Sequence, residues 1–296
     1  MTEPLLEVRD LVKDYVVGRG RRKQVQRAVD HVSFDIAPGE ILGLVGESGS
    51  GKSTTARCLL GLVEPTAGEV RFAGQDLLRA KGDSARRLRS KIQMVFQDPY
   101  SSLDPRMRIE DVVAEGMAIH GTHRNDRRER VAQLLEMVGL SADDMRRRPG
   151  QFSGGQRQRI GIARALALDP ELLVCDEPVA SLDVSIQAQI LNLFRRLQRE
   201  LNLTVLFIAH DLATVRFLCD RVAVMDAGAI QEIGSIAEIY DSPTSAYTRE
   251  LLAAVPVPDP GVQRARNAAR RKARGGVAAT SRDDTDVASA PDARVR

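Results

Sequence analysis

The sequence predicts an α/β fold in which a mostly parallel sheet is accompanied by an antiparallel β subdomain and interrupted by an inserted α-helical subdomain. Short apolar runs of strand length alternate with longer segments of helical periodicity, which is typical of parallel sheets covered by helices. Between Pro99 and Leu168, in contrast, the pattern is helical throughout. We therefore expect one α/β core, 4–98 and 169–240, that is split by a helical insert, 99–168.

Strand patterns dominate the chain before the insert. The opening run LLEVRDLVKDY has the pattern of a strand, and the Gly/Arg-rich stretch VVGRGRRKQVQR after it indicates an exposed loop. A helix is expected over 52–63, after the short apolar strand ILGLVG. The further strand patterns before the insert are AVDHVSFDI, GEVRFAG and KIQMVFQD, the second of them in a hairpin.

Helical periodicity defines the insert, and alternation resumes after it. The helical segments of the insert are RIEDVVAEGMAIHG, RRERVAQLLEMVGL and GGQRQRIGIARALAL. After the insert, the strands ELLVCDEP and TVLFIAH alternate with the helices SIQAQILNLFRRLQREL and LATVRFLC, and the hairpin RVAVMDAGAIQEIG follows. Strands and helices of these lengths predict the parallel order of the core sheet.

The net charge of +3 is concentrated at the C-terminal end of the chain. From residue 261 onward there are nine Lys or Arg and four Asp, which leaves 34 basic and 36 acidic residues, a net charge of −2, in the remainder. Because the folded part is not basic, we do not expect it to bind nucleic acid. The segment 263–296 lacks apolar periodicity and is predicted to be a disordered basic tail; the alternative is a segment that contacts anionic lipid.

Apolar runs and cysteines limit the class of protein further. No apolar run reaches the ~20 residues that a membrane helix needs, and the start MTEPLLEVRD lacks the basic flank and apolar core of a signal peptide. We therefore expect a soluble chain in the cytoplasm, unless a partner holds it at a membrane. Cys58, Cys175 and Cys219 lack metal-ligand spacing and are expected to be small buried apolar residues.

A glycine-rich loop, GESGSGKST, stands between the strand ILGLVG and the helix after it and fits G-x-x-x-x-G-K-[ST]. Glycines let backbone N–H groups turn toward the β-phosphate of a nucleoside triphosphate, while Lys52 reaches the β/γ oxygens and the Ser53 hydroxyl is a ligand of Mg²⁺. The pattern predicts a P-loop NTPase core that binds a nucleoside triphosphate and Mg²⁺; the alternative is a Gly/Ser-rich turn that happens to contain a lysine. The predicted phosphate-binding residues are Gly46, Glu47, Ser48, Gly49, Ser50, Gly51, Lys52, Ser53 and Thr54.

Two carboxylates end the apolar strand ELLVCDEP, at the edge of the sheet where a P-loop also lies. Asp176 is predicted to hold Mg²⁺ through water, and Glu177 to polarise the attacking water. Positioned acid–base catalysis contributes ~10²–10⁴-fold, and positioning and charge supply most of the advantage in phosphoryl transfer. The alternative is a strand that ends in a solvated Asp-Glu-Pro turn.

A second glycine-rich stretch, QFSGGQRQR at 151–159, also precedes a helical run, and helix N-termini favour anions. Alone, it is better explained by a helix N-cap turn without a ligand. Together, the motifs of the chain resemble those of the ATP-binding subunits of ABC transporters, over roughly residues 5 to 260. These motifs are the P-loop, FSGGQ at 152–156, DEP at 176–178, SLD at 181–183, Gln97 after one apolar strand and His210 after another.

The resemblance implies why one small domain has two phosphate-binding stretches. In that family each nucleotide lies between two subunits, with the P-loop of one facing the signature loop of the other. Ser153, Gly154, Gly155 and Gln156 would then contact the ATP of the partner. ATP would join the subunits, and hydrolysis would release them.

The resemblance also implies roles for single residues. Tyr15 would stack on adenine, the alternative being a buried strand aromatic, and Asp183 would shape the dimer interface. His210 would contact the γ-phosphate, the alternative being a histidine in a solvated turn, and Gln97 would touch Mg²⁺ or the attacking water. The implied catalytic residues are Glu177, His210, Gln97 and Lys52, and the implied Mg²⁺ ligands are Ser53, Gln97 and Asp176.

Longer stretches resemble the oligopeptide/dipeptide (and nickel) permease ATPases of prokaryotes. They include QDPYSSLDPRM, DVSIQAQILNLF, HDLATVRFLCDRVAVM and SPTSAYTRELLAAVPVPDP, so that 241–262 would be the C-terminal extension of that branch. The chain departs from the pattern in two places. The common SALD is ASLD at 180–183, and the cysteines with which some members hold an iron–sulfur cluster are missing.

The resemblance therefore implies an ATP-hydrolysing, energy-coupling subunit of a peptide importer at the cytoplasmic face of the cell membrane. Its implied partners are a second ABC ATPase, different or identical, two membrane permease subunits and, indirectly, an extracytoplasmic solute-binding protein. Alternatives are the ATPase of a nickel or other small-solute importer, an exporter ATPase, and a soluble ABC ATPase acting on nucleic acid or ribosomes.

Overall fold

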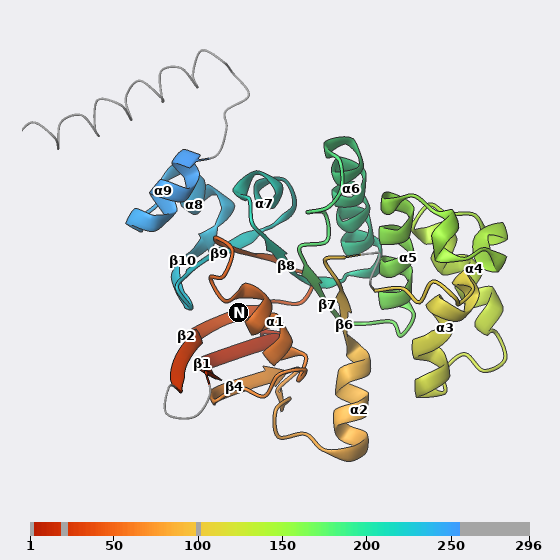
Figure 1. Ribbon diagram of the computed structural model, residues 1–296, viewed down its shortest axis with the longest axis horizontal. Coiled ribbons are helices and arrows are strands. Elements are labelled where there is room, and N and C mark those ends of the chain that lie inside the picture. The colour runs from red at the N-terminus through yellow and green to blue at the C-terminus, as the bar shows by residue number, and fades with distance from the viewer. Residues whose placement is uncertain (1–2, 19–22, 99–101, 255–296) are drawn as a thin grey trace, which may run out of the picture. The chain divides into compact units, whose positions relative to one another are not determined.

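A six-stranded sheet with the order β10-β9-β3-β8-β7-β6 forms the centre of the fold. The computed structural model describes residues 3–18, 23–98 and 102–254, whose course is shown in Figure 1. Strand β3 pairs in parallel with β8 and β9, and β7 pairs in parallel with β8 and β6, whereas β10 is antiparallel to β9. The strands are β3 (Ile41–Val45), β6 (Ile92–Val95), β7 (Leu172–Asp176), β8 (Thr204–Ala209), β9 (Arg221–Asp226) and β10 (Ala229–Ser235).

The carboxyl ends of the buried parallel strands carry the motif residues. Strands β3, β7 and β8 are buried along their whole length, as expected for parallel strands covered on both faces. Their carboxyl ends meet at one edge of the sheet, where ligands of open α/β sheets bind. The P-loop follows β3 at this edge, Glu177 follows β7, and His210 follows β8.

A second, antiparallel sheet has the order β2-β1-β4-β5. Figure 1 shows β2, β1 and β4 side by side, in the red and orange part of the chain. Its strands are β1 (Leu6–Val17), β2 (Gln24–Ile36), β4 (Ala67–Phe72) and β5 (Gln75–Asp76). One apolar core joins this sheet to the parallel one, since Leu6 and Val70 belong to the same buried cluster as Leu44, Leu59 and Val174.

The spacing of apolar residues explains which face of a core helix is buried, and the residue at its end explains where the helix stops. Helix α6 buries Ile190, Leu193, Phe194 and Leu197, which lie on one helical face, and it ends where Asn202 adopts left-handed backbone angles. The ring of Phe194 packs edge-on against Phe207 of β8, with 5.7 Å between ring centres. The helices around the core are α1 (Lys52–Leu59), α2 (Gly82–Lys91), α6 (Val184–Leu201) and α7 (Leu212–Leu218).

The helical insert lies between β6 and β7 in the chain. Its α-helices, which Figure 1 shows together in yellow and green, are α3 (Ile109–His120), α4 (Arg127–Met137) and α5 (Gly154–Leu166); the 3₁₀ helices Ala142–Arg146 and Pro149–Gln151 connect α4 to α5. Arg159 of α5 donates to the carbonyl oxygen of Val138 at 2.6 Å, and Arg196 of α6 donates to that of Met137. These bonds join α4 to α5 and to the long helix of the core.

A C-terminal hairpin and two short helices complete the described chain. Helix α8 (Ile236–Asp241) follows β10 and is joined to α7 by a hydrogen bond from the Tyr240 hydroxyl to the carbonyl oxygen of Leu212. Helix α9 (Ala246–Ala254) follows it. No helix in the described ranges is long and apolar enough to span a membrane.

The predicted fold class is confirmed, and the differences are local. The helix expected over 52–63 ends at Leu59, because the chain turns at Gly61, which has a φ of 65°. The loop expected over 16–27 is shorter, since the register Val16 to Val25 extends the β1–β2 ladder. Helix α2 and strand β5 were not predicted. The three cysteines are buried and free, as expected. The predicted disordered tail, 263–296, lies outside the described residues.

Candidate nucleotide site

The P-loop joins β3 to α1 and is held by close backbone packing. A Cβ atom on Gly46 would lie 2.0 Å from the carbonyl oxygen of Met225, and one on Gly51 would lie 2.3 Å from that of Ala28. Gly51 also has a φ of 105°, in the left-handed region that favours glycine. Gly46 and Gly51 are therefore required by the packing of the loop as well as by any ligand.

Lys52 turns back over the loop. Its Nζ donates to the carbonyl oxygens of Gly46 and Glu47, at 2.8 Å each, and to Ser50 Oγ at 3.3 Å. Burial lowers the pKa of Lys52, and the negative charges of the two carboxylates after β7 oppose this shift. A buried ammonium group among these polar atoms is a strong donor for phosphate oxygens.

The site offers hard oxygen ligands for a cation. The hydroxyl of Ser53 donates to Asp176 Oδ1 at 2.8 Å, and Asp176 is 4% exposed at the end of β7. Mg²⁺ usually takes one or two such protein ligands and completes its shell with water and substrate phosphates. Within the described residues, no group of three or more His, Cys, Asp and Glu could hold a metal alone. This donor set therefore fits Mg²⁺ bound together with a nucleotide.

Glu177 has an unusual backbone conformation, with a φ of 46°. Its amide N–H donates to the carbonyl oxygen of Ile208 in β8 at 3.1 Å, which fixes this conformation. Its carboxylate accepts a hydrogen bond from Gln97 Nε2 at 2.9 Å. The residue after β7 is thus held in contact with a residue that follows β6, just before the insert.

One cavity of about 510 Å³ collects most of these side chains. Tyr15 lines it from β1, and this residue is 36% exposed rather than buried. An apolar strand edge and a polar glycine loop in one cavity match the base and the phosphates of a nucleotide. The cavity is lined by Tyr15, Val16, Val17, Gln26, Ala28, Ser48, Gly49, Gly51, Lys52, Ser53, Thr54, Gln97 and Glu177.

His210 lies beside this cavity and does not line it. It lines a neighbouring cavity of about 270 Å³, together with Glu177 and Ala180. The next residue, Asp211, caps α7 by accepting the amide N–H of Thr214 at 2.8 Å. The structure thus places the predicted γ-phosphate sensor next to the predicted catalytic carboxylate.

The predicted signature residues form a separate site at the start of α5. Ser153 and Gln156 cap the helix reciprocally, with Ser153 N donating to Gln156 Oε1 at 3.0 Å and Gln156 N donating to Ser153 Oγ at 3.3 Å. A Cβ atom on Gly155 would lie 2.5 Å from Ile186 Cγ2, and Asp183 caps α6 by accepting the amide N–H of Ile186 at 3.0 Å. Ser153, Gly154, Gly155, Gln156 and Asp183 therefore lie together, and none of them lines the P-loop cavity.

Comparison with known proteins identifies the family. Residues 29–180 match the family model described as ABC transporter. The chain is also 52% identical, over 271 residues, to the oligopeptide transport ATP-binding protein OppF of Bacillus subtilis, an alignment that covers 90% of this chain and 87% of the relative. The chain belongs to the ABC transporter family. Within the family, it is 49% identical over 272 residues to the dipeptide transport ATP-binding protein DppF of Lactococcus lactis, covering 90% of this chain and 86% of that relative.

Solved ABC structures have the same fold. The ATP-binding cassette MJ0796, in a dimeric post-hydrolysis state bound to ADP and Pi, matches with a TM-score of 0.69 and 29% identity over 78% of this chain and 98% of that chain. CbiO1 from Clostridium perfringens, part of the transporter complex cbiONQ, matches with a TM-score of 0.71 and 26% identity over 93% of this chain and 98% of that chain. The resemblance predicted from the motifs, with its oligopeptide/dipeptide branch, is confirmed, and the chain is an ABC-type ATPase that binds ATP.

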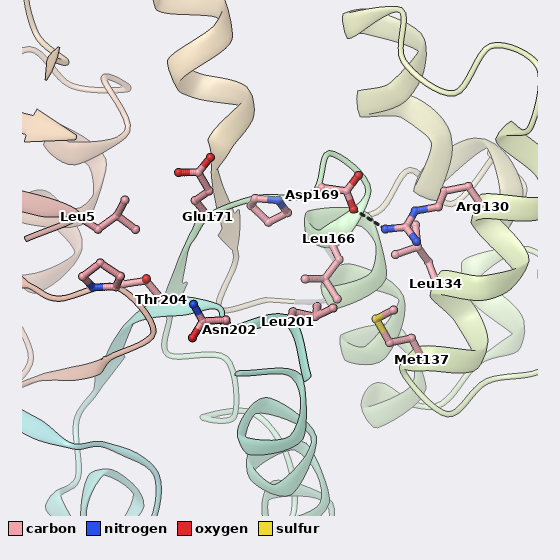
Figure 2. A pocket seen from close by; sticks show the side chains of 12 residues that line it. Leu5, Arg130, Leu134, Met137, Leu166, Asp169, Glu171, Leu201, Asn202 and Thr204 are labelled. Atoms are coloured by element: carbon pink, nitrogen blue, oxygen red, sulfur yellow. Dashed lines mark hydrogen bonds and ion pairs between the residues drawn. The ribbon is translucent and has the colours of Figure 1, made fainter. Parts of the chain in front are cut away.

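A cavity of about 390 Å³ at the amino ends of β7 and β8 is separate from the nucleotide site. Figure 2 shows Arg130 of α4 pointing toward Asp169, with which it forms an ion pair. Leu134 and Met137 line the same cavity from α4, and Leu201 and Thr204 line it from the core. No predicted site residue lies here, and the ion pair joins the insert to the turn before β7.

Sequence reasoning missed one contact of the P-loop. The amide N–H of Glu47 donates to the hydroxyl of Tyr247, 200 residues further along the chain, at 3.3 Å. Tyr247 lies in the segment SPTSAYT, whose likeness to peptide permease ATPases was the only signal in the sequence. That signal indicates a family branch but not a contact with the nucleotide site.

Proposed function

We propose that the chain is the ATP-hydrolysing, energy-coupling subunit of an importer for peptides of the dipeptide or oligopeptide class. The coupling role is supported by one observation: the P-loop and the signature residues, which the family uses on the same nucleotide, lie apart in this chain. We call these two parts half-sites. The P-loop, Tyr15 and Glu177 share one cavity, whereas the signature residues at the start of α5 lie outside it. A second ATPase subunit is needed to bring a signature loop to the bound ATP.

The proposed chemistry assigns one task to each group in the cavity. Lys52 and the loop amides bind the phosphates, and Ser53 and Asp176, with Gln97, hold Mg²⁺, which when bound neutralises charge on the phosphate oxygens. Glu177 accepts a proton from the attacking water. Gln97 orients Glu177 through their hydrogen bond, and His210 contacts the γ-phosphate from the neighbouring cavity.

The signature residues are proposed to contact the nucleotide that the partner ATPase binds. Ser153, Gly154, Gly155 and Gln156 would face its nucleotide, and Asp183 would lie at the interface beside them. The partner is proposed to be a different ATPase of the same family, with a second copy of this chain as the alternative.

Membrane permease subunits are the other proposed partners, and a groove offers a surface for them. A cavity of about 400 Å³ lies between the core and the insert and is lined by Phe96 of the core and Ile119 of α3. Phe96, Leu62 and Ile119 are large apolar side chains exposed to 43%, 62% and 61%. Phe96 directly precedes Gln97, which bonds to the carboxylate of Glu177. A subunit bound in this groove would therefore be linked to Glu177 through Gln97. This docking would hold the chain at the cytoplasmic face of the membrane.

Peptide cargo is supported by the named relatives OppF and DppF at 49–52% identity. A nickel or other small-solute importer would use the same ATPase chemistry and is the second candidate. An extracytoplasmic solute-binding protein would deliver the cargo in either case.

An uptake measurement tests the proposal. The chromosomal copy is replaced by Glu177→Gln or, as a matched surface control, by Glu200→Gln, and cells are given a radiolabelled tripeptide, free amino acid or ⁶³Ni²⁺. Only tripeptide uptake should fail, and only with Glu177→Gln. Loss of nickel uptake with intact peptide uptake would contradict the peptide assignment.

A second measurement tests the partners. The tagged chain is purified from native membranes in mild detergent, and the proteins that accompany it are identified by mass spectrometry. Two membrane subunits and a second ATPase are expected. Recovery of the chain with ribosomal or DNA-bound proteins instead would contradict the coupling role.

A further inference from the structure

The C-terminal extension contacts the P-loop through the side chain of Tyr247. The Tyr247 hydroxyl accepts the amide N–H of Glu47 at 3.3 Å. Burial raises the pKa of Tyr247, so this hydroxyl stays neutral at physiological pH. Glu47 follows Gly46, the first glycine of the loop, so the contact lies at the point where β3 passes into the phosphate-binding turn.

Helix α9, which carries Tyr247, is fixed by a carboxylate of the core sheet. Glu232 of β10 accepts the amide N–H and the hydroxyl of Thr244, at 2.7 and 2.8 Å, and the amide N–H of Ser245 at 3.1 Å. Burial alone would raise the pKa of Glu232, but the nearby hydroxyl of Thr248 and the hydrogen bonds from Thr244 and Ser245 outweigh it and lower the pKa to about 2. An ionised Glu232 therefore holds the turn that leads into α9.

The same hairpin holds the loop at a second point. The amide N–H of Gly228, in the β9–β10 turn, donates to the carbonyl oxygen of Ser50 at 3.0 Å. Within the loop, Ser50 N donates to the carbonyl oxygen of Glu47 at 3.2 Å. The turn from Glu47 to Ser50 is therefore bound at one end by Gly228 and at the other by Tyr247.

These two contacts are made by the residues that also bind Lys52, through other atoms. Lys52 Nζ bonds to the carbonyl oxygen of Glu47 and to Ser50 Oγ, the two residues that the hairpin and its extension hold. A shift of either residue would move the ammonium group that is expected to reach the phosphates.

We propose that Tyr247 is a positioning residue of the nucleotide site: by holding Glu47, the C-terminal extension sets the shape of the P-loop, and bound nucleotide in turn stabilises the docking of α9. The proposal rests on the phosphate-binding role of the loop and is independent of the transported cargo. It assigns the segment SPTSAYT a task inside the chain's own active site.

The test compares Tyr247 with Tyr240 of α8, whose hydroxyl also makes a hydrogen bond to a backbone group. Tyr247→Phe keeps the ring and removes the contact with Glu47, whereas the control Tyr240→Phe removes the bond to Leu212 in α7. Affinity of the purified chain for Mg²⁺-ATP is measured by calorimetry. Tyr247→Phe should weaken binding about two- to tenfold, the range for one hydrogen bond, and Tyr240→Phe should leave it unchanged.

Hydrogen exchange supplies a readout that does not depend on activity. In the unchanged chain, ATP should slow exchange in 246–254. In Tyr247→Phe, the amides of 46–52 should exchange faster, and ATP should no longer slow exchange in 246–254. Glu232→Gln, which leaves the tyrosine in place, should reproduce both effects by releasing α9.

The proposal is overturned if Tyr247→Phe matches the unchanged chain in ATP affinity and in exchange of 46–52, since the tyrosine would then only pack. It is also overturned if Tyr240→Phe has the same effect as Tyr247→Phe. Loss of peptide uptake is not needed for either conclusion, so a failure of the cargo assignment would leave the result intact.

Discussion

The side-chain amide of Gln97 donates to the carboxylate of Glu177 at 2.9 Å, which joins the residue before the helical insert to the residue after β7. The insert leaves the core after β6 and returns to it at β7, the neighbouring strand of the sheet. Gln97 follows β6 on the path to the insert, so its hydrogen bond links this part of the chain to the proposed general base.

Replacing Glu177, the proposed general base, tests its role in hydrolysis directly. Glu177→Gln keeps the shape of the side chain and can still pair with Gln97, but it cannot accept a proton from water. ATP hydrolysis by the membrane-assembled protein should fall ~10²–10⁴-fold, while ATP binding by the purified chain persists. Phosphate release and calorimetry measure the two quantities, with Glu200→Gln as control. Equal rates for the two variants would remove Glu177 from the mechanism.

Removing the ammonium group should affect binding itself. Lys52→Ala loses the donor that contacts the loop carbonyls and is proposed to bind phosphate oxygens. The purified chain should lose measurable affinity for Mg²⁺-ATP in calorimetry. Lys91→Ala removes a lysine that pairs with Glu171 on the surface, and it should bind as the unchanged chain does. Tight ATP binding by Lys52→Ala would contradict the P-loop assignment.

The exposed ring of Tyr15 predicts selectivity for the base. Stacking on an aromatic ring contributes ~1–3 kcal/mol per base, so Tyr15→Ala should weaken ATP binding about 5- to 150-fold. Tyr15→Trp should keep the affinity, and tripolyphosphate, which has no base, should bind all three proteins equally. An equal loss for ATP and tripolyphosphate would mean that the substitution distorts the loop instead.

Two adjacent glycines of the signature turn should respond differently to alanine. A Cβ atom on Gly155 would lie 2.5 Å from Ile186 Cγ2, whereas one on Gly154 would lie 3.5 Å from Leu182 Cδ2, an ordinary contact. Gly155→Ala should lower the free energy of unfolding by ~1–3 kcal/mol through overpacking. Gly154→Ala should be neutral or slightly stabilising in a helix. Urea unfolding measures both, and equal stabilities would contradict the close approach of α5 and α6.

The docking of α9 should depend on pH through Glu232. Its pKa in the folded chain is about 2, below the ordinary value of 4.5. A depressed pKa means that the stabilisation is fully present above pH 4.5 and is lost as the pH falls from about 4.5 to about 2. Proteolysis at 241–254 by pepsin should therefore increase across this window. Glu232→Gln should already be cleaved more readily at pH 5, and Glu250→Gln, an exposed control, should follow the unchanged chain.

Local sequence patterns predicted the buried elements well. Strands β3, β7 and β8 are continuous apolar runs, and the motif residues follow their carboxyl ends, so both the sheet and the edge that carries the site were predicted from the sequence. Helix α2 was missed because it buries only Ala85 and Leu88 and is otherwise polar, which leaves little apolar periodicity to detect.

Contacts between distant segments were beyond the reach of the sequence. The hydrogen bond from Glu47 to Tyr247 spans 200 residues, and the close approach of Gly155 to Ile186 depends on how two helices cross. Neither follows from spacing or composition, because each is determined by tertiary packing. The resemblance to a family predicted which residues share a task, whereas the structure supplied the contacts between them.

The position of β3 in the sheet has a consequence for biosynthesis. Strand β3 ends at Val45, but both of its neighbours, β8 and β9, begin only at Thr204 and Arg221. At about 5–20 residues per second, the ribosome needs roughly 8–30 seconds to translate the stretch between β3 and β8. During that time the wholly apolar strand that carries the P-loop has no partner in its sheet. The nascent chain is therefore expected to expose an aggregation-prone segment until most of the protein has been made.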